Sequence, residues 1–159
     1  MALFLPTATW TSPIAPYSQA DPRKFVDIVW LVPTAKDLRE GDIALIKTGW
    51  SSKTWGRIEY FTESPHLTEG AAQWLVRRRV KAVAFDCTAD DARKLALGQP
   101  TGPGEFPVHG TLLSEGVPMI EHLVNTTAIT SKRAKIYAFP LKFKGRIEAA
   151  PTRVILFEE

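Results

Sequence analysis

The 159-residue chain contains few of the residues that form disulfides or bind metal ions. It has one cysteine, Cys87, and three histidines, His66, His109 and His122. One cysteine excludes an internal disulfide and suits a reducing compartment. A structural zinc site usually takes four protein ligands and a catalytic site three plus a water, so these residues alone do not define a metal site.

The chain also lacks long hydrophobic runs and a strong excess of charge. No window approaches the roughly 20 apolar residues that span a bilayer, and no signal sequence opens the chain. We therefore expect a cytoplasmic protein with no membrane partner. The net charge is +3 and the basic residues are scattered. The run Arg77–Arg79 falls at the end of a predicted helix, where cations complement the helix dipole, so no nucleic-acid partner is expected.

The residues that are present indicate one α/β domain covering residues 1–159. Hydrophobic residues make up 45% of the sequence, which is enough for a substantial core. Strand and helix signals alternate, an order that favours an α/β arrangement. Strands are predicted at Lys24–Val32, Asp42–Gly49, Val80–Asp86, Ala134–Pro140 and Thr152–Glu158, the last two as an antiparallel pair.

Helices and loops fill the intervals between these strands. Helices are predicted over Thr34–Glu40, from Thr68 to about Arg79, and within Glu115–Asn125 beyond Pro118. An aromatic loop is expected at Trp50–Pro65 and a flexible surface loop at Cys87–Glu105.

The segment FPVHGTLLSEGVPMIEHLVN carries the strongest candidates for chemistry. His109 and Glu121 lie twelve residues apart in it, and both residue types are common ligands of divalent metals. A lone histidine beside apolar residues is more often structural, however, and on a helix His122 would point about 100° away from Glu121. For a substrate pocket, aromatic residues could stack on a flat ligand, although packing explains them equally well: Trp10, Trp50, Trp55 and Tyr60.

Five blocks in one order resemble the Putative cyclase family, which includes bacterial kynurenine formamidase (arylformamidase) and isatin hydrolase. They are GDIALIKTGW, WGRIEYF, SPHLTEGAAQWLVRRRVKAVAFD, the His109 segment and PLKFKGRIEAAPTRVILFE, and they cover about Asp42 to Phe157. The resemblance implies a swivelling β/β/α fold with a mixed sheet and flanking helices. It also implies a homo-oligomer, a dimer or larger, that opens an amide or formamide with a Zn²⁺- or Mn²⁺-activated water. His109 and Glu121 match the family's downstream ligands.

The upstream signature of the family, H-x-G-T-H-x-D-x-P-x-H, is degraded. Its closest match is ATWTSPIAPY, where Thr9 fits the threonine and Trp10 replaces a ligand histidine. An indole nitrogen is a donor only and cannot coordinate a metal. The segment before it is also short, so we expect a domain shortened at its N-terminus and an incomplete metal site.

Two functions remain open for a chain of this kind. One is a metal-dependent hydrolase of a formamide, lactone or cyclic amide, active only where another polypeptide or subunit completes the site. The other is a non-catalytic descendant that holds no metal in this chain alone and keeps a pocket for a small aromatic amide-like ligand. We favour impaired or lost catalysis for the chain as written. Nucleic-acid binding ranks last.

Overall fold

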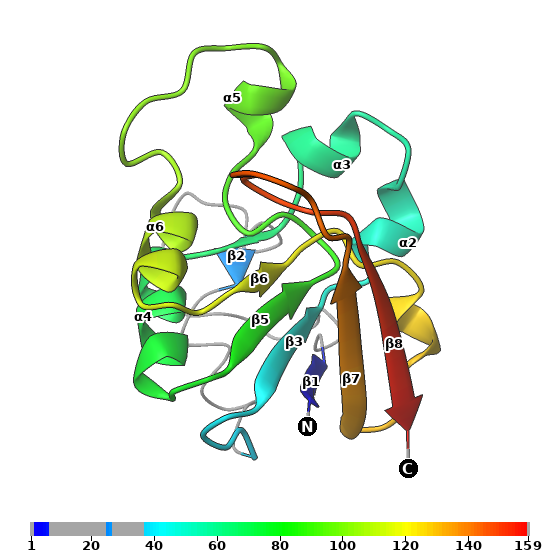
Figure 1. Ribbon diagram of the computed structural model, residues 1–159. Helices are drawn as coiled ribbons and strands as arrows, with labels where there is room; N and C mark the ends of the chain where they lie inside the picture. Colours follow the sequence, from blue (N-terminus) through cyan, green and yellow to red (C-terminus); the bar gives the residue numbers. More distant parts are fainter. Residues whose placement is uncertain (1, 7–24, 27–36, 159) are drawn as a thin grey trace, which may run out of the picture.

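A mixed six-stranded sheet forms the centre of the protein (Figure 1). This computed structural model describes residues 2–6, 25–26 and 37–158. The strand order is β6-β5-β3-β1-β7-β8, in which β6, β5, β3 and β1 are parallel and the last two strands antiparallel. The bounds are β1 Ala2–Pro6, β3 Ile43–Lys47, β5 Ala82–Phe85, β6 Met119–Ile120, β7 Arg133–Pro140 and β8 Thr152–Glu158. A separate parallel pair joins β2 Phe25–Val26 to β4 His66–Leu67.

The central strands β3 and β5 are buried on both faces, as parallel strands usually are. Ala44 and Ile46 of β3 contribute to one core cluster, whereas Leu45 belongs to a second. In β5, Val83 and Phe85 face the first cluster and Ala84 the second. The near-continuous apolar runs IALIK and AVAF therefore follow from burial on two sides.

Two helices cover the first cluster. Helix α4 (Glu69–Arg77) begins at Thr68, whose side chain accepts a hydrogen bond from the Ala71 amide, and it buries Ala71, Ala72 and Leu75. Helix α6 (Pro107–Ser114) lies beside α4 on the same side of the sheet (Figure 1) and buries Val108 and Leu112. The shorter helices are α2 Trp50–Thr54, α3 Glu59–Thr62, α5 Arg93–Ala96 and the 3-10 helix η1 Thr126–Ala128.

The β7–β8 hairpin closes over the second cluster. Its register runs from Ala134 opposite Glu158 to Pro140 opposite Thr152. The inward residues Ala134, Val154 and Leu156 pack against that cluster. At its base, Arg133 donates to both carboxylate oxygens of Asp42 at 2.6 and 2.7 Å, a bidentate ion pair that joins the hairpin to the start of β3.

A buried connector of five residues, the Asp86–Asp90 segment, leaves the carboxyl end of β5. All five residues are 4% exposed or less. The Asp86 carboxylate accepts from the Thr48 hydroxyl, from the Thr48 and Gly49 amides (both 2.7 Å) and from the Thr126 hydroxyl (2.6 Å). Gly49 has φ 71°, a left-handed conformation that glycine adopts readily where the chain turns between β3 and α2. Asp86 thus ties the ends of β3 and β5 to η1.

The expected mixed sheet with flanking helices is confirmed, and so are the central strands, the helix after Thr68 and the late antiparallel pair. Of the predicted strand at Lys24–Val32, only Phe25–Val26 lies within the described residues. The helix predicted over Thr34–Glu40 is wrong for its described part, because residues 37–40 form a turn that ends at Gly41 (φ 80°).

Three further expectations about local structure are wrong. The aromatic segment at 50–65 is not one loop, since it forms α2 and α3. The region 87–105 is not all surface, since it begins with the buried connector and contains α5. The helix expected within 115–125 lies earlier, as α6: the left-handed Gly116 (φ 71°) follows that helix, and Met119–Ile120 pair with β5.

Among the described residues, no helix combines the length and the apolar character needed to cross a bilayer.

The four contacts of Asp86 make a stability prediction. Asp86→Asn replaces one accepting oxygen by an NH₂ group that faces donors, so the free energy of unfolding should fall by about 3 kcal/mol. Urea unfolding followed by circular dichroism measures the change. The exposed Asp91→Asn is the matched control and should change stability by less than about 0.5 kcal/mol. Equal effects of the two substitutions would contradict the role given to Asp86.

Candidate functional site

The candidate site lies at the carboxyl edge of the parallel strands. Thr48 follows β3, Asp86 follows β5 and Glu121 follows β6, so parallel pairing brings all three to one edge of the sheet (Figure 1). Ligand sites of open α/β sheets commonly occupy this edge. The Asp86 carboxylate is saturated by its four donors, which makes it a structural residue of the edge.

His109 is held from behind by Asp90. The Nδ1–H group of His109 donates to Asp90 Oδ2 at 2.7 Å, and the same carboxylate accepts from the Val108 and His109 amides at 2.8 and 3.0 Å. The same Asp90 carboxylate therefore caps the first turn of α6 and fixes the orientation of the His109 ring. The Asp90 side chain is 4% exposed, whereas that of His109 is 36% exposed.

Glu121 faces the other nitrogen of the same ring. Its Oε2 lies 3.3 Å from His109 Nε2, and its Oε1 accepts from the Ala89 amide at 2.9 Å. The two residues that the sequence singled out, twelve positions apart, are thus brought together. Both are oriented by the Asp86–Asp90 segment, through Asp90 and the Ala89 amide respectively.

The charges of the site shift two pKa values in opposite directions. Hydrogen bonds to Asp90 and then to Glu121 raise the pKa of His109 from 6.5 to about 10, against the opposing effect of its burial. For Glu121, burial raises the pKa, but the hydrogen bonds from His109 and the Ala89 amide outweigh it and leave the pKa lowered. In the metal-free protein the two residues form an imidazolium–carboxylate pair.

An aromatic cluster adjoins this pair and is formed by Trp55, Tyr60, Phe61 and His122. The Tyr60 ring packs edge-on against Trp55 and Phe61 at 5.1 and 4.9 Å between ring centroids. Its hydroxyl forms a 3.0 Å hydrogen bond with His122 Nδ1. Burial, followed by the nearby charges of Cys87, Asp86 and Glu121, raises the pKa of Tyr60 above its usual range.

The His122 ring bonds to Tyr60, and the residue lies in a left-handed turn and not in a helix. Its φ of 60° is left-handed, a conformation that costs a non-glycine residue about 1–2 kcal/mol. The hydrogen bond to Tyr60 and a ring contact with Phe61 at 5.9 Å accompany this turn. His122 therefore belongs to the aromatic cluster and not to the His109–Glu121 pair.

The four aromatic residues predicted for a pocket differ in how far they are exposed to solvent. Trp55 is 55% exposed, while Tyr60 is 1% exposed. Trp50 is half-buried, packs against the first core cluster and donates its Nε1–H to the Tyr60 carbonyl at 3.1 Å. Trp10 lies outside the described residues.

His66 and Cys87 have the structural roles expected of them. His66 is buried in β4 and contacts the Ser64 carbonyl through Nδ1 at 3.2 Å. Cys87 is fully buried in the first core cluster, where burial and the charge of Asp86 raise the pKa of its thiol.

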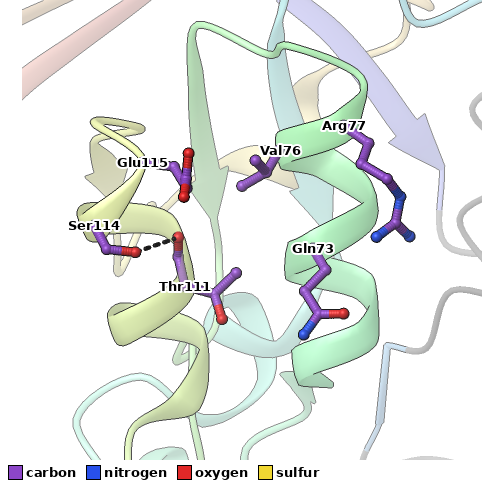
Figure 2. Close-up of a pocket in the computed structure, with 6 residues that line it drawn as sticks. All are labelled: Gln73, Val76, Arg77, Thr111, Ser114 and Glu115. Carbon is purple, nitrogen blue, oxygen red and sulfur yellow. Dashed lines mark hydrogen bonds between the residues drawn. The ribbon is translucent and has the colours of Figure 1, made fainter.

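A hollow of about 340 Å³ lies elsewhere, between α4 and α6 (Figure 2). Its walls come from the outward sides of the two helices, and Asp90, His109 and Glu121 do not line it. The lining residues are Gln73, Val76, Arg77, Thr111, Ser114 and Glu115.

His109 and Glu121 fit a divalent metal as two donors, but not as a complete site. A metal-bound histidine usually donates its other ring N–H to a carboxylate, and Asp90 occupies that position. Within the part of the chain that the structure describes, no group of three or more His, Cys, Asp and Glu side chains is arranged to hold a metal ion. Asp90 does not add a third donor, because its oxygens are taken by α6 and the His109 ring.

The sequence did not point to Asp90 or Asp86 as site residues. A signal was present for Asp86, an acid directly after a buried parallel strand, which is where polar residues of an α/β site collect. Asp90 had no such signal, because it acts through amides and a ring that are 18 and 19 residues away in the sequence.

Comparisons with known proteins point to one family. A family model described as Putative cyclase matches residues 18–92. An uncharacterized protein of Methanocaldococcus jannaschii is 34% identical over 116 residues, which are 72% of this chain and 53% of that protein. The chain therefore spans about half the length of this curated relative.

Solved structures agree in fold. A potential metal-dependent hydrolase with cyclase activity is 30% identical, with a TM-score of 0.60 over 84% of this chain and 62% of its own. A protein from Bacillus stearothermophilus described as a predicted metal-dependent hydrolase is also 30% identical, with a TM-score of 0.59 over 84% of this chain and 61% of its own. An isatin hydrolase bound to thioisatinate is 20% identical and shares the fold, with a TM-score of 0.67 over 84% of this chain and 53% of its own.

The raised pKa of His109 makes a prediction for the metal-free protein. NMR titration should find its imidazole protonated through pH 8, with the pKa near 10. Since the folded pKa lies above the unfolded value of 6.5, the contribution to stability is complete below pH 6.5 and is lost as the pH rises toward 10.

Two variants test the causes of this shift. Asp90→Asn should lower the pKa of His109 more than Glu121→Gln does, because the hydrogen bond to Asp90 is the larger cause. A wild-type His109 that titrates near 6.5 would contradict the geometry described for the pair.

Proposed function

We propose that the chain, a member of the cyclase family, carries one part of a hydrolase metal centre, since two solved relatives are described as a potential and a predicted metal-dependent hydrolase. His109 and Glu121 are the ligands that this chain supplies. Catalysis by the chain alone is impaired, because the histidine-rich upstream signature that the resemblance implies is degraded around Trp10. The activity to which the centre belongs is hydrolysis of an amide, formamide or cyclic amide.

The observation that carries the proposal is the line of contacts from Asp90 through His109 to Glu121. A buried carboxylate fixes the ring at Nδ1, and the opposite nitrogen points at a second carboxylate 3.3 Å away. This arrangement resembles the carboxylate–histidine–metal pattern of metalloenzymes. A purely structural histidine would not need an independently anchored acid at its remaining nitrogen. The Ala89 amide supplies that anchor for Glu121.

The expected metal is Zn²⁺ or Mn²⁺, and bound there it would polarise a carbonyl and lower the pKa of a water. The chain's own residues hold two coordination positions for it. Catalytic zinc sites use three protein ligands, so two donors support weak binding without turnover. We accordingly assign to this chain the retention of one histidine and one glutamate ligand, and assign no reaction step to it.

The aromatic cluster supports a flat, amide-like ligand next to this centre. The rings of the exposed Trp55, of Phe61 and of His122 surround Tyr60, and its hydroxyl bonds to His122, the residue after Glu121. Aromatic side chains with a few polar groups are common linings of small-molecule sites. Of the residues first proposed for the pocket, we retain the exposed Trp55 in this proposal and add the exposed Phe61, while the buried Tyr60 packs behind them.

A second candidate is an active hydrolase whose site is completed by another subunit. It is favoured by the 36% exposure of the His109 side chain, which leaves the pair accessible to ligands from outside. Under this alternative the chain turns over formamides, lactones or cyclic amides only in the presence of the completing polypeptide. The two candidates share the same His109 and Glu121 ligands and differ in whether a partner restores activity.

Metal binding can be tested directly by titrating Zn²⁺ and Mn²⁺ in a calorimeter. His109→Ala and Glu121→Ala should each weaken binding by more than about 100-fold, and Asp90→Asn by about 10- to 100-fold, as for residues that orient a ligand. His122→Ala is the matched control and should bind as the wild type does, since its ring faces Tyr60. If His122→Ala weakens binding as much as His109→Ala, the ligand assignment is wrong.

Activity separates the two candidate functions. The chain alone, loaded with Zn²⁺ or Mn²⁺, should not hydrolyse N-formylated anilines or isatin above the rate of the free metal. Absorbance at the product wavelength provides the measurement. Turnover that His109→Ala abolishes would contradict impaired catalysis and establish the active alternative.

A further inference from the structure

The β7–β8 hairpin has an outer face that is as apolar as its inner face. Alternation places Tyr137 and Phe139 of β7 beside Ile155 and Phe157 of β8 on the side opposite Ala134, Val154 and Leu156. The four outer residues are 46, 56, 41 and 55% exposed respectively. A hairpin with water on one face normally alternates apolar and polar residues. The β7–β8 hairpin is apolar on both faces, a pattern typical of strands that are covered on both sides.

The exposed apolar surface continues beyond the strands. Leu141, Phe143 and Ile147, in the connection between β7 and β8, are 60, 49 and 48% exposed. This connection extends past the sheet in Figure 1. With about 200 Å² per large side chain and roughly half of each exposed, the four residues of the hairpin face offer about 400 Å². The largest apolar patch on a typical monomer is about 300–600 Å² and often functional, so a patch of this size is consistent with a binding surface.

The outer face is organised in a way that suits a copy of itself. Tyr137 and Ile155 are opposite each other at its centre, Lys135 is paired with Phe157 at one end, and Arg153 with Phe139 at the other. When two such faces stack on each other, the two-fold axis that relates them lies between the faces. It can run either parallel or perpendicular to the strands. Either axis places each cation over a phenylalanine of the other copy and never over a cation.

The aromatic rings add to this self-complementarity. Tyr137 is nearly parallel to Phe139, with an interplanar angle of 4°, and perpendicular to Phe157, at 90°. The patch therefore presents ring faces and ring edges together. Edge-to-face and cation–π contacts are both favourable, and an isologous interface requires each patch to supply both sides of the contact.

We infer that the outer face of the β7–β8 hairpin, centred on Tyr137 and Ile155, binds the same face of a second copy of this chain. The apolar centre, with charges only at the two ends, matches the pattern of homodimer interfaces. In the described part of the chain nothing packs over this face, as the exposures of its residues show. The inference does not rest on the proposed hydrolase function, because it concerns a surface of the hairpin and not the His109–Glu121 pair.

The test compares two charge variants that remove the same apolar area. Phe139→Lys/Phe157→Lys places cations over Lys135 and Arg153 of the other copy and should weaken dimerisation by about 100-fold or more. Phe139→Glu/Phe157→Glu places carboxylates over the same cations and should dimerise more tightly than the lysine variant. Leu95→Lys/Leu97→Lys, at two α5 positions that are 62 and 54% exposed, is the control and should leave dimerisation unchanged.

Sedimentation equilibrium gives the mass, which is 17.7 kDa for one chain. The wild type should sediment as a dimer with twice that mass at micromolar concentration. A wild-type monomer at about 100 µM, a concentration far above that needed for a specific dimer, would overturn the inference and indicate another occupant of the face. Equal dimer dissociation constants for the lysine and glutamate variants would also overturn the inference, because non-specific hydrophobic association does not depend on the sign of the introduced charge.

Cysteine cross-linking covers the case in which a charge variant fails to fold. Tyr137→Cys alone, Ile155→Cys alone and an equal mixture of the two are treated with a short bismaleimide, with Leu97→Cys as the control. If the two-fold axis is perpendicular to the strands, each residue faces its own copy and covalent dimers should form in the single variants. If the axis is parallel to the strands, Tyr137 faces Ile155 and covalent dimers should form in the mixture. No dimer above the Leu97→Cys level in any sample would contradict the contact. Cys87 is fully buried and should not react.

Discussion

The buried Asp86–Asp90 segment is the constraint on which the rest of the structure depends. At its start, four donors from two separate parts of the chain, residues 48–49 and Thr126, converge on the Asp86 carboxylate. At its end, Asp90 caps α6, and between them the Ala89 amide binds Glu121. A buried carboxylate without its donors would cost several kcal/mol, so each of these groups is held where the carboxylates require it. The edge of the sheet is therefore assembled around two acids that face inward.

The same constraint explains why the candidate site is pre-organised but incomplete. His109 is fixed by Asp90 and Glu121 by Ala89, so neither donor has to be ordered when a ligand arrives. Pre-organisation of this kind is typical of functional sites. A chain can keep it while losing other ligands, because the carboxylates that orient the pair also hold α6 and the sheet edge together.

Unlike the sheet edge, the β7–β8 hairpin is packed against the rest of the protein on one face only. Its inner residues belong to the second core cluster, and the Arg133–Asp42 ion pair attaches its base to the start of β3. Its outer aromatic residues remain exposed. Hydrophobic burial favours covering such a face, and its arrangement of apolar and charged residues is complementary to the same face of a second copy. Association at the hairpin and chemistry at the sheet edge are separable properties of the protein.

The sequence by itself determined the elements whose signals are local: the buried strands, the helix capped at Thr68, the late antiparallel pair and the candidacy of His109 and Glu121. It misplaced the helix near 115–125 because apolar residues around Pro118 fit a short buried strand as well as a helix. Only the tertiary structure decided that His109 and Glu121 meet, that Asp90 orients the ring and that His122 turns to Tyr60. Those contacts join residues far apart in the sequence, and hydrophobic periodicity contains no information about which polar groups the folded sheet brings together.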